Sequence, residues 1–182
     1  MGEREQMIVI TAINDYELKP NDVCVFLAGG ITNCYEWQNM VIERLKEFND
    51  TDRLVMFNPR RDDFPIGNPN ASLEQIKWEY KWLERMDIFS MYFAKSESDQ
   101  PICMYELGRN LLRMQMRYPT SWRKRIIISV EQGYRREQDV DIQTALATNN
   151  LCHINKSCDT NTLIYAHSSS IYDAYQNVLL RA

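Results

Sequence analysis

Residues 23–30 read VCVFLAGG, an apolar run that ends in two glycines. A short apolar run bounded by a turn signal predicts a strand that is buried on both faces. The next segment, residues 35–48, places apolar residues at helical spacing. A strand, a glycine turn and a helix in this order are typical of α/β proteins, so this part of the chain predicts a parallel sheet covered by helices.

The same alternation continues along the chain. Further buried strands are predicted at residues 53–59 (RLVMFNP), 87–93 (DIFSMYF) and 125–131 (RIIISVE). A helix is predicted over residues 71–86, with Ile76, Leu83 and Met86 on one side, and another begins at Pro101, a favoured first residue of a helix.

The two ends of the chain add further elements. The tail predicts a short helix near residues 139–147, a strand around residues 161–166 and a final helix from about Ser170. The leading run MIVITAI, residues 7–13, fits either an extra edge strand or a hairpin arm. Because the sequence contains no internal repeat or linker, we expect one domain, residues 1–182, with helix, sheet and helix layers.

The composition is that of an ordinary globular protein. The 182 residues carry 21 Lys+Arg and 25 Asp+Glu, which gives a formal net charge of −4, and 45% of them are hydrophobic. A chain of this length buries enough apolar surface to fold without disulfides or a structural metal. The acidic balance argues against a nucleic-acid polymer as partner, because such proteins usually carry a dominant basic face.

Targeting and redox signals favour the cytoplasm. No run approaches the roughly 20 apolar residues of a membrane span, and residues 1–22 lack the features of a signal peptide. The five cysteines form no CxxC pair, and their odd number predicts reduced thiols. His153 and His167 lie in no ligand motif, so we expect no metal site.

Ligands of open parallel sheets bind beyond the carboxyl ends of the strands, so the segments that follow the strands are candidate sites. After the first of them, Gly29 and Gly30 allow the backbone to approach a ligand closely. These glycines belong neither to a GxGxxG fingerprint nor to a Walker A loop. A nicotinamide-dependent dehydrogenase and a P-loop NTPase are therefore both disfavoured.

The segment FNPRRDDFP, residues 57–65, places Arg60, Arg61, Asp62 and Asp63 in four consecutive positions. Two interpretations remain open for these charges. An arginine that reaches the crevice would hold a phosphate through its planar guanidinium group. Alternatively, the four side chains neutralise one another in a solvated turn.

Glu106 lies about a turn and a half into the helix predicted from Pro101. The positive end of a helix dipole stabilises a carboxylate by about 0.3–1 kcal/mol, so we expect Glu106 to be ionised, as a nucleophile must be. The alternative is a residue that only complements the dipole. In the preceding helix, Trp78 and Trp82 either stack on a base, form an exposed interface stripe or pack in the core.

Five separated motifs resemble the nucleoside 2-deoxyribosyltransferase-like family. They are FLAGGI, WQNMVIERL, FNPRRDDFP, EQIKWEYKWLERMDI and PICMYELGR, in the order and spacing of the family. The resemblance covers about residues 23–146, including GYRREQDVDI, and leaves residues 151–182 as an extension. It implies a flavodoxin-like α/β fold with a five-stranded parallel sheet. The better-known relatives are nucleoside 2-deoxyribosyltransferases and a deoxynucleoside 5′-monophosphate N-glycosidase, and no metal or organic cofactor is implied for this chain.

The resemblance also implies roles for individual residues. Glu106, in YELG, matches the catalytic glutamate that attacks the anomeric carbon and forms a covalent glycosyl intermediate. Glu79 matches the second carboxylate, an aspartate in the relatives, which handles protons at the base or positions the sugar. The candidate substrate-binding residues are Gly29, Gly30, Ile31, Asn58, Arg60, Arg61, Asp62, Trp78, Gln100 and Asp141.

Two of these candidates depart from the family pattern. Gln100 stands where the transferases have an aspartate for the 5′-hydroxyl and the monophosphate hydrolase has a serine near the phosphate. Asp141 falls near the position where an asparagine of a neighbouring subunit completes the transferase site. The resemblance therefore implies a homo-oligomer but leaves the 5′ group of the substrate open.

The chemistry of N-glycosidic bonds agrees with this assignment. One carboxylate traps the oxocarbenium-like carbon and a second acidic group protonates or orients the leaving base. Glu106 and Glu79 supply that pair, and Glu79 is expected to hold a proton because it faces the charge of Glu106. Three functions remain open for a small-molecule nucleoside or nucleotide: hydrolysis, transfer to a second base, and binding or sensing without turnover.

Overall fold

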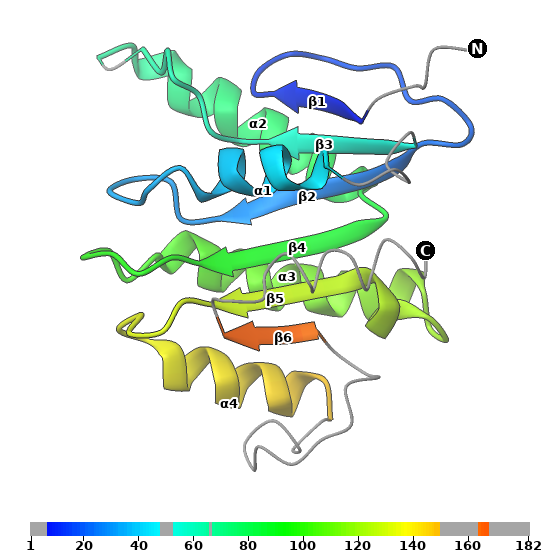
Figure 1. Cartoon of the computed structure of the whole chain (residues 1–182), viewed down its shortest axis with the longest axis vertical. Coiled ribbons are helices and arrows are strands. Elements are labelled where there is room, and N and C mark those ends of the chain that lie inside the picture. Colours follow the sequence, from blue (N-terminus) through cyan, green and yellow to red (C-terminus); the bar gives the residue numbers. More distant parts are fainter. Residues whose placement is uncertain (1–6, 48–52, 66, 150–163, 168–182) are drawn as a thin grey trace.

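Parallel strands form the sheet at the centre of the molecule (Figure 1). The computed structural model describes residues 7–47, 53–65, 67–149 and 164–167. Within these residues the strands are β1 (Ile8–Thr11), β2 (Val23–Gly29), β3 (Leu54–Asn58), β4 (Ile88–Phe93), β5 (Ile126–Val130) and β6 (Ile164–His167). Adjacent strands are parallel throughout, in the order β1-β3-β2-β4-β5-β6. All carboxyl ends therefore meet at one edge.

The strand order confirms the predicted fold. Counted from β2, the strands follow the order 2-1-3-4-5 of flavodoxin-like proteins. β1 is the extra N-terminal strand, and it pairs in parallel with β3, with Ile8 opposite Val55. The run at residues 7–13 is therefore an edge strand and not a hairpin arm, which would pair antiparallel. The strand predicted around residues 161–166 is β6, which pairs with β5.

Helices cover both faces of the sheet (Figure 1). α1 (Trp37–Leu45) packs on one face through Trp37, Val41, Ile42 and Leu45. α2 (Pro69–Arg85), α3 (Pro101–Arg117) and α4 (Glu137–Ala147) contribute to the core of the other face. A short 3-10 helix, η1 (Trp122–Arg125), leads into β5. The helix predicted from about Ser170 lies outside the described residues.

The local sequence explains where these elements begin. Every residue of β3, β4 and β5 is buried, as expected for parallel strands covered on both faces. The side chain of Asn68 accepts a hydrogen bond of 3.0 Å from the backbone N–H of Asn70, so it caps α2, and Pro69 follows as the first helical residue. α3 begins at Pro101, as predicted. Both helices thus start at the edge where the strands end.

The buried side of α2 differs from the predicted one. Leu83 and Met86 are buried as expected, but Ile76 is 60% exposed. Trp78 and Trp82 are only 6% and 0% exposed, so the hypothesis that they form an exposed interface pair is wrong. The two large rings determine which side of α2 faces the sheet, because they fill space against its aromatic side chains.

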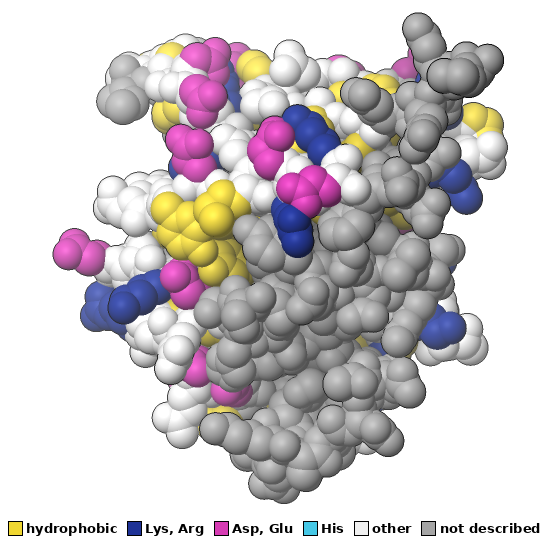
Figure 2. All heavy atoms as spheres, in the orientation of Figure 1, with side chains coloured by type: hydrophobic (Ala, Val, Ile, Leu, Met, Phe, Trp, Pro, Cys, Tyr) yellow, Lys and Arg dark blue, Asp and Glu magenta, His cyan; other side chains and the backbone are white. Residues whose placement is uncertain are grey.

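The described residues on the face that α1 covers carry charges of both signs. Figure 2 shows lysine, arginine, aspartate and glutamate side chains interspersed among the described residues of this face. None of the described helices has the length and apolar character needed to cross a membrane.

We predict that Trp82→Ala lowers the free energy of unfolding by about 3–5 kcal/mol, measured by urea denaturation. Trp82 stacks on Phe57 with a ring-centroid distance of 4.0 Å and leaves a large cavity when truncated. Trp82→Phe should cost less, because it keeps a ring and removes an indole N–H that is buried without a hydrogen-bond partner. Lys77→Ala, on the exposed side of α2, serves as the control. A loss below about 1 kcal/mol in Trp82→Ala would contradict the importance of this contact.

Candidate active site

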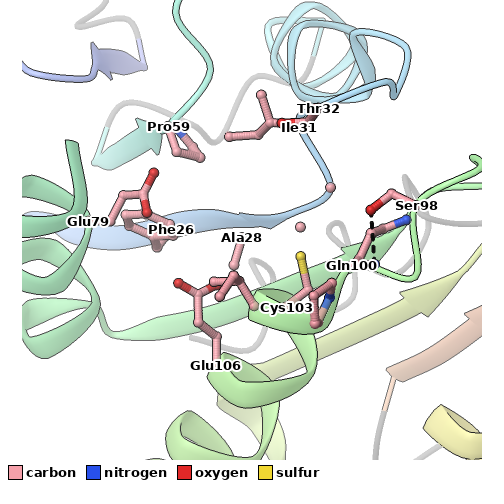
Figure 3. Close-up of a pocket in the computed structure, with 14 residues that line it drawn as sticks. Phe26, Ala28, Ile31, Thr32, Pro59, Glu79, Ser98, Gln100, Cys103 and Glu106 are labelled. Carbon is pink, nitrogen blue, oxygen red and sulfur yellow. Dashed lines mark hydrogen bonds between the residues drawn. The ribbon is translucent and has the colours of Figure 1, made fainter. Parts of the chain in front are cut away.

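A cavity of about 210 Å³ opens at the carboxyl end of β2, where β3 and β4 flank it on opposite sides. This is the point at which the strand order reverses, the usual ligand position in open α/β sheets. The lining comes from β2, the loops after β2, β3 and β4, and the facing sides of α2 and α3 (Figure 3). The lining residues are Phe26, Ala28, Gly29, Gly30, Ile31, Thr32, Pro59, Glu79, Ser98, Gln100, Pro101, Ile102, Cys103 and Glu106.

The two glycines after β2 are required by close contacts. Gly29 has a φ of +146°, and a Cβ atom there would lie 2.2 Å from the carbonyl oxygen of Tyr92. A Cβ atom at Gly30 would lie 2.6 Å from Oε1 of Gln100. Real Cβ atoms do not approach other atoms this closely. The glycines thus allow the first loop of the cavity to lie directly against β4 and the loop after it.

Glu79 from α2 and Glu106 from α3 both line the cavity and lie at the same end of it, beside Phe26 (Figure 3). The pKa of Glu106 is raised to about 7, mainly by burial and also by the nearby charge of Glu79, while Arg109 opposes the shift. Burial also raises the pKa of Glu79, against a hydrogen bond from Gln75 that lowers it. The structure therefore brings together, in one cavity, two carboxyl groups whose pKa values are both raised.

The expectation that the helix dipole keeps Glu106 ionised is wrong in direction. Glu106 is the sixth residue of α3, which begins at Pro101, and the dipole effect is largely confined to the first turn. Burial in the cavity and the charge of Glu79 outweigh it, so the pKa of Glu106 is raised rather than lowered. Arg109 gives limited help, because its guanidinium group forms an ion pair of 2.7 Å with Glu84.

Gln100 lies at the opposite end of the cavity from the two glutamates (Figure 3). It is 5% exposed and has a left-handed backbone conformation, with φ of 47°. Its Nε2 donates to the carbonyl of Ala94 at 2.6 Å, and its backbone N–H donates to Oγ of Ser98 at 3.1 Å. Its Oε1 is buried without a hydrogen-bond partner. Gln100 thus lines the cavity and carries a buried acceptor that lacks a donor.

The segment GYRR after β5 holds the loop that carries Gln100. The hydroxyl group of Tyr134 donates to the carbonyl of Asp99 at 2.7 Å. Arg135 donates from Nη1 to the carbonyl of Glu97 at 2.8 Å. The GYRREQDVDI motif therefore reaches the site indirectly, through the backbone of this loop.

Arg60 does not line the cavity, and its guanidinium group is already engaged. Nε donates to Oε1 of Gln38 at 3.0 Å. Nη2 donates to the carbonyls of Ile31, Cys34 and Tyr35 at 3.2, 3.2 and 2.9 Å. Arg60 therefore holds the loop between β2 and α1 in place, and this contact set argues against a role in binding phosphate.

Other predicted binding residues also lie away from the cavity lining. Arg61 pairs with Asp63 at 3.3 Å, and Asp62 is exposed on the same loop. The amide of Asn58 is buried and bonds Asn39 and the backbone of Arg60. Asp141 lies on α4.

Trp78 supports the cavity from behind. Its indole N–H donates to the carbonyl of Asn14 at 2.6 Å, and its ring packs 5.9 Å from that of Phe26, which lines the cavity. The position of Trp78 in the core does not fit the predicted stacking on a base, and Trp82 is buried still more deeply.

The sequence alone did not identify several of the residues that line the cavity. Phe26 and Ala28 share a strand face with period two, and Cys103 precedes Glu106 by three positions on the same side of α3. Once the strand and the helix had been predicted, these spacings would have identified Phe26, Ala28 and Cys103 as residues that line the site. Burial raises the pKa of Cys103 to about 12, so its thiol is neutral. Among the described residues, no three His, Cys, Asp or Glu side chains are grouped as metal ligands.

A comparison with known protein families identifies the family to which this chain belongs. A family profile described as nucleoside 2-deoxyribosyltransferase like matches residues 22–117, more than half of the chain. The match includes both glutamates and all the other residues that line the cavity. No curated protein matches the chain. The chain therefore belongs to the nucleoside 2-deoxyribosyltransferase-like family.

Proposed function

We propose that the protein cleaves or transfers at the N-glycosidic bond of a (deoxy)nucleoside or nucleoside 5′-monophosphate, with Glu106 as the nucleophile and Glu79 as its acid–base partner. The observation that carries the proposal is the pair of half-buried carboxyl groups at one end of a single cavity. Family membership supports the substrate class, because the family is named for nucleoside chemistry.

The reaction proceeds in two displacements. A carboxylate oxygen of Glu106 forms a bond to the anomeric carbon while the bond from that carbon to the base breaks. The bonding electrons leave with the base, which takes a proton from Glu79. Water or a second base then attacks the anomeric carbon, loses a proton to Glu79 and releases the Glu106 carboxylate. The first acceptor gives hydrolysis and the second gives transfer.

The raised pKa values are compatible with the roles of Glu106 as nucleophile and Glu79 as acid–base partner. Attack requires an ionised Glu106, whereas departure of the base requires a proton on Glu79. Burial raises the pKa of both carboxyl groups, and the charge of Glu79 adds to the rise at Glu106, so the pair retains a proton closer to neutral pH than ordinary glutamates would. A single proton on the pair provides both forms when it resides on Glu79.

Gln100 is the candidate contact for the 5′ end of the sugar. It lies across the cavity from the glutamates, and its buried Oε1 lacks a donor. A free 5′-hydroxyl would donate to this oxygen, whereas a phosphate dianion has no proton to give. With Arg60 bound to loop carbonyls, these contacts favour a nucleoside over its 5′-monophosphate.

We predict that Glu106→Ala abolishes release of base from deoxynucleosides, because it removes the attacking atom, while ligand binding persists. Glu79→Ala should slow release by about 10²–10⁴-fold, the range for general acid–base catalysis, and less for bases that leave easily. Glu74→Ala, an exposed glutamate of α2, is the matched control and should retain the wild-type rate. The assay measures base released from deoxynucleosides and their 5′-monophosphates by chromatography.

The same assay separates the rival functions. A new nucleoside formed when a second base is added identifies a transferase, and sugar released without one identifies a hydrolase. Nucleoside binding without any product, equally strong in Glu106→Ala, would show a binding or sensing module and contradict the proposal. Near-normal turnover in Glu106→Ala would contradict the role of Glu106.

We further propose that the protein is a homo-oligomer and that the second copy binds the outer face of α2 and α3. This face carries a seam of exposed apolar residues at steps of three, seven and four positions along α3, so they lie on one side of the helix, with neighbours on α2. They are Ile102, Tyr105, Leu112 and Met116 on α3 and Leu73, Ile76 and Tyr80 on α2. The guanidinium group of Arg109 lies 4.3 Å from the ring centroid of Tyr80 and connects the two rows.

The position of this face supports a second copy as the occupant. Ile102 belongs both to the seam and to the cavity lining, so a bound subunit would lie at the mouth of the site. That arrangement agrees with the resemblance, which implies sites covered across a subunit interface. We propose this seam as the interface instead of the pair Trp78 and Trp82, because both tryptophans are buried in the core.

We predict a dimer or larger assembly at micromolar concentration, measured by light scattering coupled to size-exclusion chromatography. Leu112→Asp should produce a monomer, because it buries a charge in an apolar interface. Met40→Asp, at an exposed apolar residue of α1 on the other face, should leave the mass unchanged. A wild-type protein that is strictly monomeric and fully active would contradict the interface.

A further inference from the structure

Gln75 contacts Glu79, one of the two carboxyl groups of the site, from outside the cavity lining. Its Nε2 donates to Oε1 of Glu79 at 2.8 Å and to the carbonyl of Pro59 at 2.6 Å. Glu79 and Pro59 both line the cavity, whereas Gln75 does not. The amide thus links α2 to the loop after β3 at the point where both meet the site.

The orientation of this amide is determined by its surroundings. Both hydrogens of Nε2 have acceptors, while Oε1 is buried without a partner. Rotation of the amide by a half turn would place Oε1 against the Pro59 carbonyl and the Glu79 carboxyl oxygen, which repel it. Gln75 therefore keeps its donor on Glu79, even though its own carbonyl remains without a hydrogen bond.

A donor fixed on one oxygen of a carboxyl group favours the ionised form of that group. Glu106 has no such donor among the hydrogen bonds of the described side chains, and it faces the charge of Glu79. The other titratable or charged groups that bear on the pair are Cys103 and Arg109, both on α3. Cys103 is neutral, and Arg109 is engaged with Glu84.

We propose that Gln75 is a positioning residue that makes Glu79 the ionised member of the pair and leaves the shared proton on Glu106 in the empty site. The part that Gln75 plays in catalysis rests on the proposed function. In that reaction the proton moves from Glu106 to Glu79 when the substrate binds, and the ionised Glu106 can then attack. Gln75 also fixes Oε1 of Glu79, so the other oxygen of this carboxyl remains available for the proton and the base.

We test this inference by carboxyl titration of the substrate-free protein, which requires no turnover. Protein labelled with carboxyl-¹³C glutamate is titrated by NMR, and Glu79→Gln and Glu106→Gln assign the two signals. In the wild type, Glu106 should titrate near pH 7, and Glu79, which accepts the hydrogen bond from Gln75, should titrate below it. In Gln75→Met, which keeps the length of the side chain without a donor, the midpoint of Glu79 should rise and that of Glu106 should fall, each by about one pH unit.

Gln115→Met is the matched control. Gln115 also donates its side-chain amide to a backbone carbonyl, that of Ala147, but lies on the outer part of α3 and outside the cavity lining. Loss of the Gln115 amide should leave the titration midpoints of Glu79 and Glu106 unchanged. Unchanged midpoints in Gln75→Met, or a Glu79 signal that titrates above Glu106 in the wild type, would overturn the inference.

The outcome is independent of the proposed function. Shifted midpoints in a protein that releases no base would support Gln75 as the positioning residue and reject the enzymatic proposal. If Gln75→Met does not fold, Gln75→Ala replaces it. Failure of both to fold would assign the amide a structural role and contradict the inference.

Discussion

The packing of α2 on the sheet through Trp78 and Trp82 is the contact on which both the fold and the site depend. Trp82 stacks on Phe57 at 4.0 Å, and Trp78 packs against Phe26 and Phe57. Glu79 follows Trp78 directly in the chain, so the same contact that buries the helix brings the carboxyl group to the carboxyl end of β2. Burial there is also what raises the pKa of Glu79.

The remaining walls of the cavity are held by backbone contacts rather than by charges that point inward. Arg60 holds the loop between β2 and α1 through three carbonyls, and GYRR holds the loop after β4 through two more. Gly29 and Gly30 allow these loops to meet. Rigid loops around two carboxyl groups suit a reaction in which the anomeric carbon must be placed within bonding distance of Glu106.

The sequence predicted the strands and most helix positions, because buried parallel strands and helix starts at proline leave strong local patterns. The flavodoxin-like order was implied by the family resemblance. The same resemblance implied that both glutamates, Gly29, Gly30, Ile31 and Gln100 belong to one site, and these residues all line one cavity. Their roles in catalysis and binding remain predictions.

Contacts between distant segments could not be predicted in this way. The role of Arg60 depends on backbone carbonyl groups in the loop between β2 and α1. The burial of Trp78 depends on contacts with Phe26 and Phe57. The protonation of Glu106 was predicted wrongly because the helix dipole is a local effect, whereas burial and the charge of Glu79 arise only in the folded chain.

The measurement that tests the central claim most directly is covalent trapping on Glu106. A 2-fluoro-sugar nucleoside slows both displacements, because the electron-poor ring destabilises the oxocarbenium-like transition states and allows the glycosyl-enzyme to accumulate. The account predicts one added sugar mass on the wild-type protein, mapped by peptide mass spectrometry to Glu106, and no addition on Glu106→Ala. An adduct on another residue, or turnover in the wild type with no adduct on Glu106, would contradict it.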